Sequence, residues 1–132
     1  MDILDVARYV VVYTERRKEP VTSVKLNYIL FAFHRLISDT YGVDLFPTVK
    51  PDNRFGYEAT HPTYEKVYMA YSKYGMVPIR LKLPYDEERD ILAKPFMYKS
   101  ELNSCIEKIQ GKHIYELYEW YLKEKKWFNV AL

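Results

Sequence analysis

Residues 21–37 join a helix-start signal to a helix that is apolar on nearly all sides. Thr22 or Ser23 can accept hydrogen bonds from the first free backbone N–H groups of a helix. Apolar side chains follow at helical spacing, and further ones fill the other face: Leu26, Ile29, Leu30, Phe31, Ala32, Phe33, Leu36 and Ile37. A helix apolar all round must be buried or inserted in a membrane. The run is too short and too charged to span a bilayer. We therefore expect a central helix, from about residue 24 to 38 or 39, around which the other elements pack.

The remaining chain predicts further helices around this one. Asp2 is a plausible cap for a helix over residues 2–16. Residues 60–62 can open a third helix that Gly75 stops, and residues 86–88 begin a short fourth. Ser100 can cap a helix that ends at Gly111, and a last helix begins near residue 113. After the last helix, Trp127 and Phe128 are expected to fold back onto the core.

A small β element is also expected. In residues 77–83, apolar side chains alternate with Pro, Arg and Lys, and this period of two is typical of a strand. The prediction for residues 1–132 is thus a mainly α, compact, single-domain helix bundle around a central buried helix, with a small β element.

The charge balance excludes a broad electrostatic footprint for nucleic acid, because 20 basic and 18 acidic residues leave a net charge of only +2. The single cysteine, Cys105, excludes an internal disulfide and suits a reducing compartment. The first residues carry Asp2 and Asp5 and no basic region before an apolar core, which is not the pattern of a secretory signal. We expect a cytoplasmic protein without a membrane segment.

Few residues point to catalysis. His34, His61 and His113 are isolated in the sequence; a hydrogen-bonded structural role is preferred for His34, with a base or ligand as the alternative. Cys105 lies on an apolar helical face, where a small buried thiol is the default. The acidic cluster at residues 86–90 complements a helix dipole. We expect no catalytic residues, no metal site and no cofactor.

Three segments resemble the Panacea domain, the family of SocA-like antitoxins and phage-associated proteins. Residues 4–10, LDVARYV, look like its opening helix, and residues 21–32, VTSVKLNYILFA, are similar to its Thr-x-x-Lys-Leu helix signature. Residues 62–75 resemble its Pro…Val-Tyr…Tyr-Gly segment, and residues 117–127 its closing helix and Trp. The chain is a divergent member by this comparison, since His61 stands where the family has Gly and Tyr28 where it has Lys.

The resemblance implies a non-enzymatic protein that neutralises a toxin, or inhibits a host or phage factor, by direct contact. Tyrosine is enriched in such contact surfaces, and the chain has 14 tyrosines. The expected contact residues are Arg54, Phe55, His61, Tyr64, Tyr68 and Tyr71. The oligomeric state is left open.

Two alternatives remain. The first is a small nucleic-acid-binding or regulatory protein, in which residues 16–18 and 123–126 would supply the phosphate contacts. The second is an enzyme, in which His34 or His61 would have to meet an acid in a pocket.

Overall fold

The computed structural model describes residues 1–46 and 62–124. This part of the chain is helical, with irregular connections and no β-strand. The helices follow in the order α1 (Ile3–Arg16), α2 (Ser23–Tyr41), α3 (Glu65–Tyr71), the 3-10 helix η1 (Ser72–Tyr74), α4 (Tyr85–Ala93), α5 (Lys99–Gln110) and α6 (Ile114–Glu124). None of these helices is both long enough and apolar enough to cross a bilayer.

Local signals set the ends of the first two helices. The Asp2 carboxylate accepts a hydrogen bond from the N–H of Leu4, and the Thr22 hydroxyl accepts one from the N–H of Lys25. Gly42 ends α2 in the left-handed conformation, with φ of 68°, which glycine adopts without steric cost. The predicted caps of both helices are thereby confirmed.

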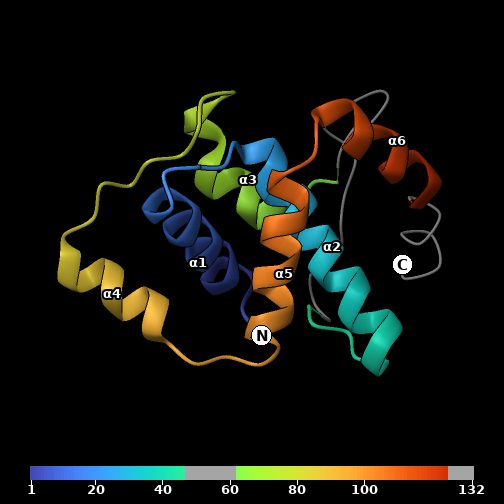
Figure 1. Ribbon diagram of the computed structural model, residues 1–132, viewed down its shortest axis with the longest axis horizontal. Helices are drawn as coiled ribbons and strands as arrows, with labels where there is room; N and C mark the ends of the chain where they lie inside the picture. The colour runs from blue at the N-terminus through green and yellow to red at the C-terminus, as the bar shows by residue number, and fades with distance from the viewer. Residues whose placement is uncertain (47–61, 125–132) are drawn as a thin grey trace.

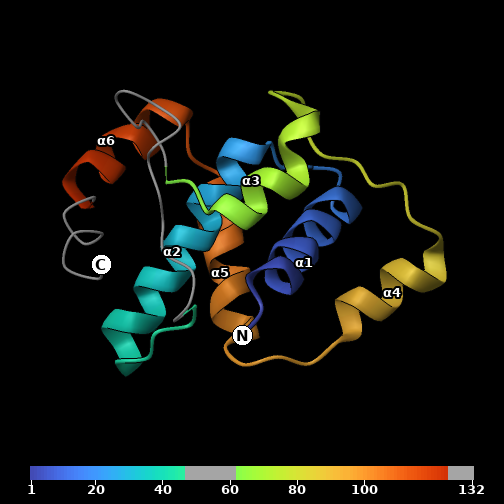
Figure 2. The same cartoon turned by 180° about the vertical axis from the view of Figure 1, so that it is seen from behind.

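The central position of α2 is also confirmed. It packs against α1, α3 and α5, and Figures 1 and 2 show α5 and α3 on opposite sides of the α1–α2 pair. Its buried residues include Leu26, Ile29, Leu30, Phe31 and Phe33, each with no exposed surface. Burying one such side chain stabilises the fold by about 1.5–3 kcal/mol. Buried residues from α1, α2, α3, α5 and α6 form one continuous core.

The two remaining helices, α4 and α6, lie at opposite ends of the long axis of the molecule (Figure 1). The α6 residues Trp120 and Tyr121 contact the ring of Phe31 edge-on, which attaches α6 to the core. By contrast, α4 has no buried residue and packs against α1. Its ion pairs include Arg8 with Glu87 at 2.8 Å.

The strand predicted over residues 77–83 is wrong. The segment is extended, but no second strand lies beside it in the described residues, and Lys82 has φ of 53°, which breaks a strand. Its backbone donors bind other groups: the N–H of Ile79 donates to the carbonyl oxygen of Val21 at 2.8 Å. The N–H groups of Leu81 and Lys82 donate to the carboxylate of Glu15 at 2.9 and 3.2 Å.

Two helix starts also differ from prediction. The third helix begins at Glu65, after Tyr64, rather than at residues 60–62. Ser100 lies inside α5, which begins one residue earlier, and Tyr98 with φ of 63° precedes it. Tertiary contacts explain this start, because the ring of Tyr98 stacks on Tyr41 with centroids 4.9 Å apart. The expected return of residues 127 and 128 to the core lies outside the described residues.

Candidate functional site

The six predicted contact residues do not form one surface. Arg54, Phe55 and His61 lie outside the described residues. Tyr64 has no exposed surface and Tyr71 is 8% exposed, so both belong to the core. Tyr68 is 37% exposed. The prediction for Tyr64 and Tyr71 is corrected, because Tyr71 lies with Val67 on the buried side of α3, and the Tyr64 hydroxyl bonds to His34 in the core.

Tyr64 instead belongs to a polar cluster with the buried His34 and with Asp44, whose side chain is 60% exposed. The Tyr64 hydroxyl oxygen lies 3.1 Å from His34 Nδ1, and His34 Nε2 lies 3.0 Å from Asp44 Oδ1. The backbone N–H of Phe46 also donates to Asp44 Oδ1, at 3.2 Å. Because the Asp44 carboxylate can only accept hydrogen bonds, its contact with Nε2 fixes the tautomer of His34. Nε2 carries the hydrogen, and Nδ1 accepts from the Tyr64 hydroxyl.

Electrostatics favour the neutral forms of His34 and Tyr64. Burial lowers the pKa of His34, and the bond to Asp44 and its charge only partly oppose that effect. Burial also raises the pKa of Tyr64 well above its ordinary value. The His34 side chain is 5% exposed, and the rings of Phe46 and Tyr64 lie against it. The cluster therefore joins the segment after α2 to the segment before α3, as expected of a structural histidine.

Asn27 holds the same region through the backbone. Its side-chain oxygen accepts a hydrogen bond from the N–H of Tyr64 at 3.0 Å. Its amide nitrogen donates to the carbonyl oxygen of Ser23 at 2.9 Å. Asn27 is 2% exposed, so both of its bonds are made in the core.

The single cysteine, Cys105, is also buried. Cys105 is 7% exposed, and burial raises the pKa of its thiol to about 11. A thiol with so high a pKa carries little thiolate at neutral pH and is a poor nucleophile. Within residues 1–46 and 62–124, His, Cys, Asp and Glu form no group of three that could hold a metal ion.

Of the basic residues considered for nucleic-acid contact, Arg16 and Arg17 form ion pairs. Arg16 Nε lies 3.6 Å from a carboxylate oxygen of Glu88. Arg17 Nη1 lies 2.9 Å from Glu107 Oε1 and 2.6 Å from the hydroxyl of Tyr13. These acids cancel the charge that phosphate contacts require.

A groove lies at one end of the bundle, and we call it the end groove. It has a volume of about 750 Å³ and forms between the C-terminal parts of α1 and α5, the first turn of α2, the first residue of α6 and the turn after η1. Its apolar lining comes from Pro20, Val24, Met76, Ile106 and Ile114. This volume falls in the range of pockets that hold a drug-sized ligand or several side chains.

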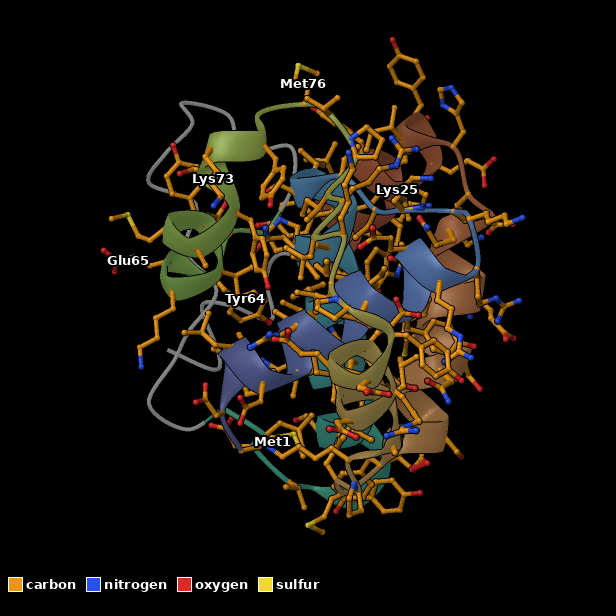
Figure 3. All side chains as sticks on the ribbon, turned by 90° about the vertical axis from the view of Figure 1, so that its left-hand side faces the viewer. Met1, Lys25, Tyr64, Glu65, Lys73 and Met76 are labelled. Carbon is orange, nitrogen blue, oxygen red and sulfur yellow. The ribbon has the colours of Figure 1, made fainter. Side chains whose placement is uncertain are left out.

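Exposed apolar side chains flank the end groove. Met76 is 89% exposed and Val77 is 62% exposed, and Figure 3 shows Met76 at the extremity of the molecule far from Met1. Ile114 is 39% exposed and its neighbour Tyr115 is 74% exposed. Methionine is flexible and polarizable and is frequent in surfaces that bind partners.

The sequence analysis missed this surface because it assigned residues 77–83 to a strand. Met76 and Val77 directly follow Gly75, which ends η1 with φ of 58°, but no local signal marks their side chains as exposed. The backbone bonds to Val21 and Glu15 then hold the segment beside α1.

A second groove, of about 600 Å³, lies between α2, α5 and α6. Its lining includes Leu36, Cys105 and Trp120. Charged residues line it too, and Arg35 forms ion pairs there with Asp39 and Glu124. Five of its six charged residues form ion pairs within it, namely Arg35, Asp39, Lys112, Glu116 and Glu124, and Lys108 forms none in the described part of the chain.

Comparison of the chain with protein-family models, with curated proteins and with solved structures finds no match.

Proposed function

We propose that this chain is a non-enzymatic protein-binding module of bacterial or phage origin, which acts in the cytoplasm as an antitoxin or inhibitor by direct protein–protein contact. The observation that carries the proposal is the end groove, with Met76 and Val77 exposed at its edge. Exposed apolar side chains that gather around a concave surface are a feature of interaction sites. The resemblance of three segments to the Panacea domain favours the same class of function.

The polar chemistry of the described residues agrees with this proposal. His34 is enclosed and bonded on both ring nitrogens, and the Cys105 thiol is buried. Arg16 and Arg17 have acidic partners, which disfavours the alternative of nucleic-acid binding. Binding would occlude the partner through shape and apolar contact, with Tyr68 as a further contact if the partner extends over α3.

Co-expression with the product of the neighbouring reading frame tests the proposal. We expect the wild-type chain to relieve growth inhibition by that product and to co-purify with it. Met76→Asp places a charge on the apolar edge of the groove and should abolish both effects. Met97→Asp is the matched control, because Met97 is 64% exposed and lies in the connection between α4 and α5. A wild-type chain that neither binds nor relieves inhibition contradicts the proposal.

A further inference from the structure

The end groove has one cation, Lys25, without an ion-pair partner among the described residues. Of the charged side chains that line it, Arg17 and Glu107 pair with each other at 2.9 Å. Glu19 is exposed to solvent. Lys25 is half-buried, and in the described part of the chain no carboxylate lies within 4.0 Å of its ammonium group.

Lys25 makes one long hydrogen bond. Its Nζ donates to the carbonyl oxygen of Gln110 at 3.4 Å. An ammonium group has three donors, and a half-buried lysine loses solvation that a single weak bond to a neutral oxygen does not replace. A carboxylate at this place would form a charge-assisted hydrogen bond, which is about twice as strong as a neutral one.

The apolar lining of the end groove indicates the second group that a bound partner would carry. Val24 lies next to Lys25 on the first turn of α2, and Met76 and Ile114 line the same groove. Among the described residues, a ligand that enters the groove thus meets an apolar wall, the unpaired cation of Lys25 and the exposed carboxylate of Glu19. One cation suits the single charge of a carboxylate better than the double charge of a phosphate, because Arg17 is already paired with Glu107.

We infer that the end groove binds a partner segment in which an apolar side chain lies beside an Asp or Glu side chain, with the apolar group against Met76 and the carboxylate on Lys25. The inference rests on the proposed function and names the chemistry of the partner at that surface. A phosphorylated segment and a purely apolar segment are different outcomes of the test.

Selection from a library of displayed 12-residue peptides tests the inference. The full-length chain is the bait, and the Met76→Asp chain removes peptides that bind elsewhere. We expect the selected peptides to share an apolar residue within a few positions of Asp or Glu. Enrichment of apolar peptides without an acid, or no enrichment over the Met76→Asp chain, overturns the inference.

Charge reversal then tests Lys25 itself. Lys25→Glu should weaken the binding of a selected peptide by about tenfold or more, which is the size expected for a partly desolvated ion pair. A peptide with Lys in place of its acid should bind the Lys25→Glu chain better than the original peptide does. Equal binding of the original peptide to the wild-type and Lys25→Glu chains overturns the inference.

The control for this substitution is Lys66→Glu. Lys66 is exposed in the first turn of α3, and Lys25 lies in the first turn of α2. Replacing either lysine by Glu places a negative charge near the positive end of a helix dipole, which favours the helix in both cases. Lys66→Glu should leave peptide binding unchanged, and circular dichroism should show that both variants fold.

The outcome separates this inference from the proposed function. If Met76→Asp abolishes toxin neutralisation and Lys25→Glu leaves it intact, the protein-binding function stands and the assigned chemistry fails. If the wild-type chain neutralises nothing and binds no partner, the proposed function itself fails.

Discussion

His34 Nε2 lies 3.0 Å from Asp44 Oδ1, and this pair anchors the segment after α2 to the centre of the bundle. The other ring nitrogen of His34 accepts a hydrogen bond from the hydroxyl of Tyr64, which precedes α3. One side chain of the central helix thus holds two segments that lie twenty positions apart, from 44 to 64. The arrangement places a buried imidazole in contact with a carboxylate whose side chain is 60% exposed, so the pair lies at the edge of the core.

Removal of the Tyr64 hydroxyl tests this role. Tyr64→Phe leaves the ring in place and removes the donor to His34 Nδ1 in a fully buried position. We expect the free energy of unfolding to fall by about 1–3 kcal/mol. Urea denaturation measures it. Tyr115→Phe removes the same atom from a residue that is 74% exposed, and should change stability by less than about 0.5 kcal/mol. Equal effects of the two substitutions would count against the polar cluster.

The lowered pKa of His34 predicts a pH dependence of stability. Burial holds this pKa below the ordinary value of 6.5, so the unfolded chain takes up the proton first as the pH falls. The contribution to stability is therefore complete above pH 6.5 and is lost as the pH falls through 6.5 toward the folded-state pKa. Urea titrations of the wild type and of His34→Gln between about pH 5 and pH 8 isolate this component. A wild-type chain that gains stability over His34→Gln as the pH falls would show the opposite sign.

Glu15 holds the segment that carries Met76. Its carboxylate accepts the N–H groups of Leu81 and Lys82, so Glu15→Ala should increase hydrogen exchange at these two amides and lower stability by about 1–3 kcal/mol. Hydrogen-exchange mass spectrometry of the peptide that spans 76–84 measures the change. Glu19→Ala is the control, since the Glu19 side chain is exposed on the loop that follows α1. Unchanged exchange in Glu15→Ala would mean that the segment is held by other contacts.

Burial of Cys105 predicts an unreactive thiol. A rise of its pKa from 9.0 to about 11 reduces the thiolate fraction at neutral pH by about a hundredfold. Alkylation by iodoacetamide should therefore be slow in the native chain and at least about a hundredfold faster in urea. Similar rates in the two states would place the thiol at the surface.

The parts of the fold that follow from local signals could be predicted from the sequence. The caps at Asp2 and Thr22 each act within a few residues, and both are as expected. The central position of α2 also follows from its own composition, because a helix apolar on all sides has no solvent-facing side.

The parts that depend on distant contacts could not be predicted. Residues 77–83 alternate as a strand does, but their backbone donors bind Glu15 and Val21, more than fifty positions earlier. Ser100 has the chemistry of a cap, but the stacking of Tyr98 on Tyr41 sets the start of α5 one residue before it. Periodicity describes one segment at a time and says nothing of its partner.

The candidate site was predicted less well than the fold. The sequence predicts a stripe of Tyr64, Val67, Tyr68 and Tyr71, but it does not say whether an aromatic stripe faces a partner or the core of its own chain. The structure buries Tyr64, Val67 and Tyr71 in the core and leaves Tyr68 37% exposed. The exposed position of Met76 depends on the packing of segments from five helices around one groove, which no local pattern encodes.

Site-specific photo-crosslinking tests the central claim most directly. A benzophenone amino acid at position 76 should form a covalent bond with the co-expressed neighbouring product in living cells, and the same amino acid at position 97 should not. Both positions are highly exposed, so solvent access does not distinguish them. Crosslinking from position 76 alone is the result that this account predicts. Crosslinking from position 97 alone, or from neither position, would contradict it.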